Sequence, residues 1–174
     1  MLFRLYRSKT VKIESLILLA GQSLFEPMAT VEKSVLVYFT AEQMFSLVRN
    51  VEDYPHFLPW CGGSKVESLS EQQEQATVEI AFKGVRQSFT TLNTAEPHRA
   101  IHMRLVDGPF KSLQGEWTFL ELTPEASKVM FTMDYEFSSK MLEQLVGPVF
   151  HSIANSFVDS FIKRAEALSS KGLL

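Results

Sequence analysis

The sequence predicts an α+β fold in which a curved antiparallel sheet of about seven strands wraps around a long C-terminal helix, with two short helices after the first strand. Three observations carry this prediction. Apolar and polar residues alternate over 128–137, which is typical of a half-buried strand. Apolar residues recur at three- and four-residue spacing over 139–169, which indicates a helix with one buried face. Short apolar runs separated by turn residues fill the region before this helix.

The first elements are a strand and two short helices. A β-branched, apolar run predicts a strand over 31–39. Thr40 is a suitable N-cap, and Gln43 three residues later completes a capping box, so a helix is predicted over 41–48. A second short helix is predicted over 50–57.

Six further strands follow, and Lys83-Gly84 predicts a tight turn between two of them. The best defined is the last, where one face carries Val129, Phe131, Met133, Tyr135 and Phe137. The predicted strands span about 63–70, 75–83, 85–95, 100–106, 113–122 and 127–137.

The C-terminal helix is expected to cover the apolar face of the sheet. Burying about eight of its side chains at roughly 1.5–3 kcal/mol each gives a gross term above ~10 kcal/mol, most of which chain entropy opposes. Gly147-Pro148 predicts a kink or break, read either as a helix following a curved sheet or as a hinge at a cavity mouth. The apolar positions are Leu142, Leu145, Val146, Val149, Phe150, Ile153, Phe157, Phe161 and Ala165.

Composition indicates one domain with a substantial core, since the chain has 174 residues, 45% of them hydrophobic, including 14 Phe. The aromatic side chains suit either a filled core or the lining of an apolar cavity between sheet and helix. We expect such a ligand cavity. Its candidate lining residues are Phe57, Phe82, Phe89, Met103, Trp117, Phe131, Met133, Tyr135, Phe150 and Phe157.

Charge divides the chain into two parts. The net charge is −3, and residues 1–27 carry four basic and two acidic side chains, or +2, which leaves −5 for the rest. A domain of that charge is not an obvious nucleic-acid binder, and no DNA partner is expected. The predicted organisation is an extension over 1–27, either untranslated or disordered, and a domain over 28–170. A signal or transit peptide is a second interpretation of the extension; we favour translation from Met28.

Two segments stand out from the regular pattern. In Asp107–Trp117 a glycine/proline turn leads into a strand that carries Trp117 and Phe119 on one face. We expect Phe110 and Lys111 at an exposed tip, where they could contact RNA or protein. In Tyr54–Cys61 large apolar groups lie between two prolines, so the segment is either a rigid plug at one end of the sheet or part of a cavity lid.

These segments resemble a known family. The stretches 46–61 and 105–117, with the long C-terminal helix, resemble the START-like, helix-grip superfamily, and more closely its coenzyme Q-binding/ribosome-association toxin (RatA) family, over about 30–168. The resemblance implies two functions. One is binding of ubiquinone or a similar prenyl lipid in support of respiration. The other is association with the large ribosomal subunit, blocking subunit joining, as the toxin of a toxin–antitoxin pair. It also implies an antitoxin partner and a bacterial cytoplasmic location, with transient contact to the inner membrane surface.

Catalytic chemistry has little support. His56, His98, His102 and His151 show no metal-ligand spacing, and Cys61 has no basic neighbour, so we expect no metal, no cofactor beyond a bound lipid, and no enzyme activity. The single cysteine also excludes an intramolecular disulfide. The alternative is a cyclase- or hydrolase-type enzyme that uses a cavity histidine or Tyr135 as an acid, and it rests on analogy of fold alone.

Overall fold

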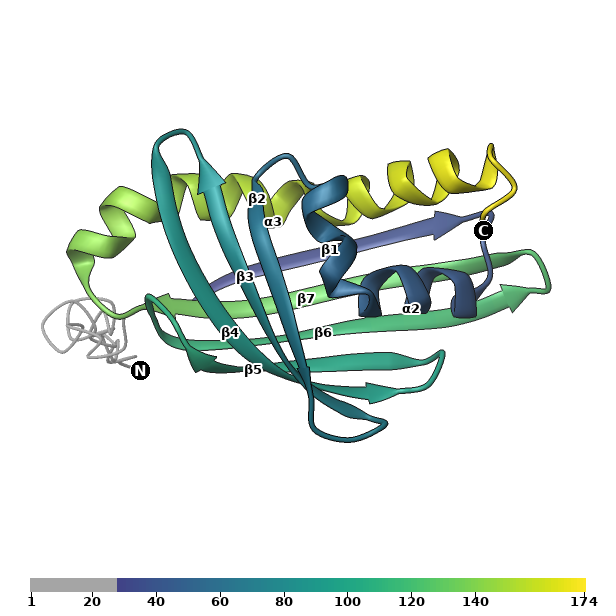
Figure 1. Ribbon diagram of the computed structural model, residues 1–174, viewed down its shortest axis with the longest axis horizontal. Coiled ribbons are helices and arrows are strands. Elements are labelled where there is room, and N and C mark those ends of the chain that lie inside the picture. Colours follow the sequence, from purple (N-terminus) through teal and green to yellow (C-terminus); the bar gives the residue numbers. More distant parts are fainter. Residues whose placement is uncertain (1–27) are drawn as a thin grey trace, which may run out of the picture.

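The computed structural model describes residues 28–174, which form one sheet, two short helices and one long helix (Figure 1). The predicted extension over 1–27 lies outside the described residues. In chain order the elements are β1 (Ala29–Val37), α2 (Ala41–Arg49), the 3₁₀ helix η1 (Val51–His56), β2 (Cys61–Ser68), β3 (Gln73–Phe82), β4 (Val85–Glu96), β5 (Ala100–Asp107), β6 (Phe110–Thr123), β7 (Ala126–Phe137) and α3 (Lys140–Ser169).

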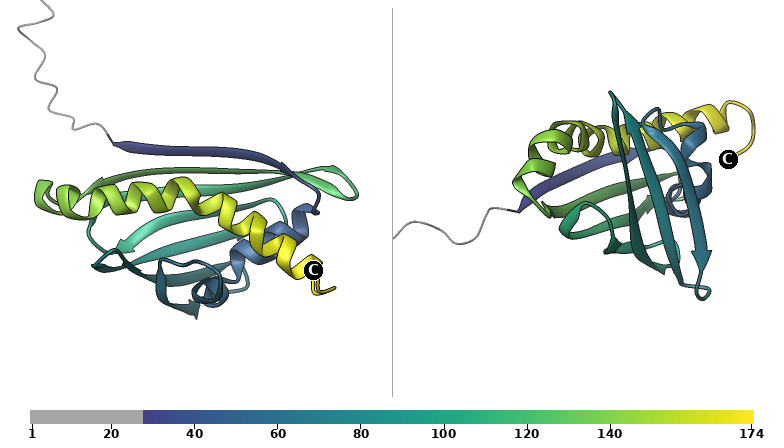
Figure 2. Two further views of the ribbon diagram at one scale, coloured as in Figure 1. Left: turned by 90° about the horizontal axis from the view of Figure 1, so that it is seen from above. Right: turned by 60° about the vertical axis from the view of Figure 1, so that its left-hand side comes forward.

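The sheet has seven strands in the order β1-β7-β6-β5-β4-β3-β2, and every neighbouring pair is antiparallel. Strands β2 to β7 form a meander, whereas β1 joins the sheet beside the last strand, with Val35 opposite Val129. α3 runs lengthwise over one face of the curved sheet (Figure 2). This arrangement confirms the predicted fold class.

Local sequence signals account for the ends of several elements. The capping box at α2 is confirmed: Thr40 Oγ1 accepts from the Gln43 backbone N–H at 3.1 Å, and Gln43 Oε1 accepts from the Thr40 N–H at 2.9 Å. The β3–β4 turn has positive φ at both Lys83 and Gly84, +49° and +82°. Positive φ at both central residues matches the twist of a two-residue hairpin.

The inner face of the sheet follows the period-two pattern. All five predicted apolar positions of β7, from Val129 to Phe137, are buried, as are Trp117 and Phe119 of β6. Trp117 lies opposite Phe131 across the β6–β7 pair, so these two fully buried rings share one row. Their ring centroids are 4.5 Å apart. This row forms the floor on which α3 packs.

α3 is helical without interruption through Pro148, so the helix does not break there; its first turns bend relative to the rest, in agreement with the predicted kink (Figure 1). Proline lacks the N–H that would bond to the preceding turn, which favours bending at that point. Leu145 was predicted on the buried face but is 64% exposed. The bend carries the first turns away from the sheet, and Val146 and Phe150 make the inward contacts there. No helix among residues 28–174 is long and apolar enough to cross a membrane.

Candidate functional site

The interior between α3 and the sheet contains a small apolar cavity of about 40 Å³. An apolar cavity that binds benzene has a volume of about 150 Å³, so this one is too small for a ring-sized ligand in the conformation observed. Its lining residues come from η1–β2, β3, β4, β7 and α3: Trp60, Ile80, Phe89, Met133, Phe150, Ile153, Ala154 and Phe157.

Four of the ten predicted lining residues surround this small void, namely Phe89, Met133, Phe150 and Phe157, and the void is smaller than the ligand cavity that the sequence predicts. The physical reason is ring packing. Trp117 is 1% exposed and contacts Phe131, Phe157 and Phe161, with ring centroids 4.5, 5.5 and 5.3 Å away. These rings occupy the space that the sequence assigned to a ligand.

Three more predicted lining residues lie apart from the void. Phe57 packs against Phe161 at 5.2 Å, with the Arg164 guanidinium over its ring at 5.4 Å. Phe82 lies at the β3–β4 hairpin with the Lys83 ammonium 5.3 Å from its ring. Met103 covers Gly115, where an added Cβ would lie 2.7 Å from the Met103 Cε. None of these three side chains lines the cavity.

Trp60 is the cavity residue that the sequence analysis singled out only as part of a segment. It is 5% exposed, and its indole N–H has no hydrogen-bond partner among the described residues. The Tyr54–Cys61 segment packs into the core through Tyr54 and Leu58, which are 5% and 1% exposed, as expected for a rigid plug. Trp60 of the same segment supplies one wall of the cavity.

A second, open pocket of about 550 Å³ lies at the start of α3, in the volume range of small-molecule sites, about 300–1,000 Å³. Tyr135 lines this pocket rather than the apolar cavity, and its ring centroid is 4.8 Å from that of Phe150. Burial, and then the nearby Glu143 carboxylate, raises the pKa of Tyr135. The phenol therefore remains a hydrogen-bond donor at neutral pH. Besides Tyr135, the lining includes Lys111, Glu136, Glu143, Gly147, Pro148 and His151.

The predicted exposure of Phe110 is wrong. Phe110 is 5% exposed, and its ring packs against Phe150 at 4.8 Å and Phe137 at 5.0 Å. The turn is shorter than the sequence suggested, because β6 begins at Phe110. Gly108 makes this turn possible, since its φ is +142° and an added Cβ would lie 2.6 Å from the Phe89 Cβ.

Lys111 is exposed as expected, with 67% of its side chain accessible. Its ammonium is paired, however: Nζ donates to Glu136 Oε1 at 2.8 Å across the β6–β7 pair. A surface ion pair of this kind has a small net energy, so Lys111 can exchange Glu136 for another anion at little cost.

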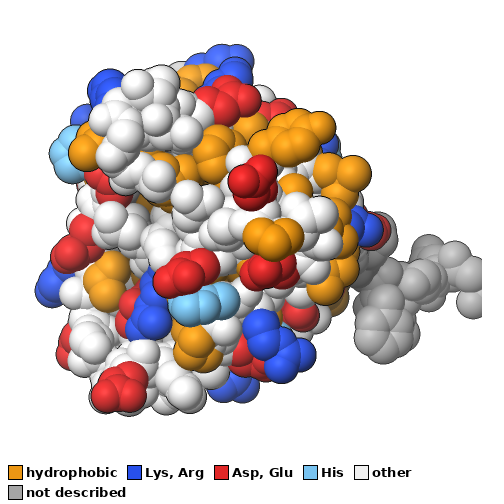
Figure 3. All heavy atoms as spheres, turned by 90° about the vertical axis from the view of Figure 1, so that its right-hand side faces the viewer, with side chains coloured by type: hydrophobic (Ala, Val, Ile, Leu, Met, Phe, Trp, Pro, Cys, Tyr) orange, Lys and Arg blue, Asp and Glu red, His pale blue; other side chains and the backbone are white. Residues whose placement is uncertain are grey.

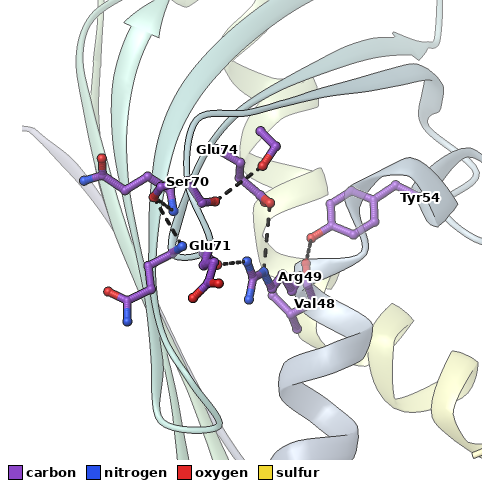
Figure 4. Close-up of polar contacts among 9 residues, drawn as sticks. Val48, Arg49, Tyr54, Ser70, Glu71 and Glu74 are labelled. Carbon is purple, nitrogen blue, oxygen red and sulfur yellow. Dashed lines mark hydrogen bonds and ion pairs between the residues drawn. The ribbon is translucent and has the colours of Figure 1, made fainter.

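A polar network joins η1, α2 and the start of β3 (Figure 4). Arg49 donates to the Glu71 carbonyl and lies 4.0 Å from the Glu74 carboxylate, and the buried Tyr54 hydroxyl donates to the Val48 carbonyl. Burial raises the pKa of Glu74, although a bond from Asn93 and the Arg49 charge oppose the shift. Burial also raises the pKa of Tyr54. These groups satisfy one another, which fits a structural role.

The histidines lie outside the apolar cavity. His56 and His98 are exposed beside Asp53 and Glu42, at 3.1 and 3.7 Å, and His102 is half-exposed between two glutamates of the sheet. Burial raises the pKa of the Cys61 thiol, which disfavours the reactive thiolate. Within residues 28–174 no group of three or more His, Cys, Asp or Glu side chains is placed to hold a metal ion.

Residues 37–162 match the family described as polyketide cyclase / dehydrase and lipid transport. The chain is 45% identical to the ribosome association toxin RatA of Vibrio cholerae over 139 residues, or 80% of this chain and 96% of that protein. The chain belongs to the RatA group of this family. It is also 40% identical to RatA of Escherichia coli K12, over 89% of this chain and 99% of the relative.

Two more distant matches have other names. The chain is 28% identical to a Xenopus laevis protein named coenzyme Q-binding protein COQ10 homolog B, mitochondrial, over 76% of this chain and 56% of that protein. The crystal structure of the Zhui aromatase/cyclase from Streptomyces sp. R1128 superposes with a TM-score of 0.69 at 19% identity, covering 82% of this chain and 96% of the other. At that identity the likeness shows the fold alone.

Proposed function

We propose that this protein is a non-enzymatic RatA-type toxin that associates with the large ribosomal subunit and blocks subunit joining. The observation that carries the proposal is the identity of 40–45% to proteins named ribosome association toxin, spread over nearly their whole length. The proposal includes an antitoxin protein as partner, a cytoplasmic location and transient contact with the inner membrane surface.

The surface limits how such an association can work. At the end of the molecule where β1 stops and α3 ends, hydrophobic, acidic and basic side chains are intermixed, and the cations do not form one broad area (Figure 3). Contact of this end with an RNA-rich particle then depends on a few local cations and weakens as salt is added. Lys111 is our candidate for one such contact, since its ammonium is accessible and forms a surface ion pair with Glu136.

Sucrose-gradient profiles of cells that overproduce the protein test the proposal. We expect free subunits to accumulate and joined ribosomes to decrease. Lys111→Gln should relieve part of this effect, whereas Lys83→Gln, which removes the same charge from an exposed hairpin, serves as the matched control. An unchanged ratio of joined to free subunits rejects the toxin function. Equal effects of the two variants reject Lys111 as a contact.

A second function, binding of ubiquinone or a similar prenyl lipid in support of respiration, is favoured by one relative and one feature. The relative is the protein named as coenzyme Q-binding. The feature is the apolar cavity under α3, which lies where a helix-grip fold would enclose a ligand. A cavity of this size must widen to admit a lipid. Mass spectrometry of lipids extracted from protein purified from its own host tests this function, and protein free of any prenyl lipid contradicts it.

A further inference from the structure

We infer that a prenyl lipid binds this protein in two compartments on either side of Phe150, an inference that rests on the second proposed function. Its ring occupies the open pocket at the start of α3, here called the head pocket, and its tail enters the apolar cavity, here called the tail cavity. The ligand class is an uncharged ring bearing a hydrogen-bond acceptor, joined to an isoprenoid chain.

Phe150 is the wall between the two compartments. It lines the tail cavity, and on the other side its ring neighbours Tyr135 at 4.8 Å and Phe137 at 6.0 Å, both of which line the head pocket. Phe89, another tail-cavity residue, is 6.2 Å from the same ring. A rotation of this single side chain therefore joins a pocket of about 550 Å³ to the tail cavity of about 40 Å³.

The helix is weakened next to this wall. Pro148 lies two residues before Phe150 and lines the head pocket. Because Pro148 has no N–H, the helical bond to the carbonyl of Gln144 is not made. Gly147 beside it adds backbone freedom. Displacing this turn therefore breaks fewer hydrogen bonds than displacing any other interior turn of α3, which provides the route by which Phe150 moves.

The charges of the head pocket select a neutral ring. Lys111 and Lys140 face Glu136 and Glu143, which gives two positive and two negative charges and a formal sum of zero. The Lys111 ammonium already bonds to Glu136 at 2.8 Å, so a phosphate would have to displace a carboxylate and remain beside it. By contrast, the carbonyl oxygen of a neutral ring requires only a hydrogen-bond donor.

Tyr135 supplies that donor. Its side chain is largely buried, at 3% exposed, and it lines the open head pocket. Its hydroxyl is not among the buried polar atoms of residues 28–174 that lack a partner, so it can donate to water or to a ligand in the pocket. The same side chain presents its ring to Phe150, so it contacts both the acceptor and the wall.

Tryptophan fluorescence quenching of the full chain by decylubiquinone measures the binding, since Trp60 lines the tail cavity. Tyr135→Phe removes only the donor, and its Kd should rise about two- to tenfold, as expected for one hydrogen bond. Gly147→Leu fills the head pocket from a helix position where an added Cβ makes ordinary contacts at 3.6 and 3.7 Å. Its Kd should rise more than ~10-fold, because a filled pocket excludes the ring altogether. Tyr38→Phe, at a side chain that is 92% exposed, should bind like the parent protein.

The outcomes separate the inference from the function on which it rests. If the parent protein does not bind decylubiquinone, prenyl lipid binding fails and the two-compartment site fails with it. If the parent protein, Tyr135→Phe and folded Gly147→Leu all bind decylubiquinone equally well, lipid binding stands, but the assignment of the ring to the head pocket is overturned. Tighter binding of geranylgeranyl diphosphate than of decylubiquinone overturns the inference that the head pocket selects a neutral ring. Circular dichroism establishes that each variant is folded.

Discussion

The two ends of α3 meet the rest of the molecule in opposite ways. Near the C-terminal end, Phe161 and Ala165 are completely buried, and Phe161 contacts the rings of Tyr54, Phe57 and Trp117. Near the N-terminal end, Met141 and Leu145 are 66% and 64% exposed, although they are large and apolar. One helix therefore combines an anchored half with a loosely held half.

The difference shows where stability and adaptability lie in this fold. The anchored half packs against η1 and the Trp117 row, and the Arg164–Asp53 ion pair at 2.8 Å ties it to η1. The other half leaves an open pocket beside it and depends on Val146 and Phe150 for its inward contacts. Regions with few buried apolar contacts open most easily, so motion of α3 should begin at its first turns.

The largest loss of stability is expected from truncating a side chain in the anchored half of α3. Phe161→Ala removes a ring that contacts four others and should lower the free energy of unfolding by about 3–5 kcal/mol. Urea unfolding followed by circular dichroism measures it. A loss below ~1 kcal/mol would mean that the anchor lies elsewhere and would remove the contrast between the two halves.

The ion pair between α3 and η1 should have a smaller effect. Asp53→Asn leaves Arg164 partly buried, with its Nε already lacking a partner, and should cost about 1–2 kcal/mol after allowance for solvent screening. Thermal unfolding at two salt concentrations checks it. If high salt destabilises the parent protein but not the Asp53→Asn variant, the pair is confirmed; identical melting of the two proteins contradicts it.

The loosely held half should tolerate polar substitution. Leu145→Ser changes an exposed side chain and should alter the free energy of unfolding by no more than ~0.5 kcal/mol. Val146→Ser, one residue along and 3% exposed, is the matched control and should cost about 1–3 kcal/mol. Equal losses would place Leu145 in a packed interface that the structure lacks.

The smallest effect concerns pH and the polar network beside the anchored half. Burial raises the pKa of Glu74 above its ordinary value of 4.5, so just above pH 4.5 the native state binds more protons than the unfolded chain. Stability contributed through this group therefore falls as the pH rises through that window. Glu74→Gln should flatten this part of the pH–stability curve. An unchanged slope would show that Glu74 ionises normally in the folded protein.

Much of the fold could be predicted because its signals are local and periodic. The alternation from Val129 to Phe137 defines one buried face whatever the neighbouring strands are, and Thr40 with Gln43 specifies a helix start within four residues. The helical spacing of α3 could not reveal that its first turns bend away from the sheet, so Leu145 was assigned to the core.

The candidate site was harder to predict, since it depends on how rings fill space. The aromatic content is compatible with a hollow or a filled interior, and only the packing of Trp117 against its neighbours decides between them. Phe110 was misplaced for a related reason: the strand begins three residues earlier than predicted, which places the Phe110 ring in the core and not at an exposed tip. Trp60 belongs to the aromatic Tyr54–Cys61 segment and directly follows Pro59, but nothing in the local sequence indicated which space its side chain faces.

The pairing of β1 with β7 has a consequence for synthesis of the protein. Ala29 lies opposite Tyr135, so this edge of the sheet cannot close until 106 further residues have been translated, and the 30 residues of α3 emerge after that. At about 5–20 residues per second the first strand waits roughly 5–20 s for its partner. During that interval the apolar face later covered by α3 has no cover from its own chain. A nascent chain of this topology is therefore exposed to chaperones until translation ends.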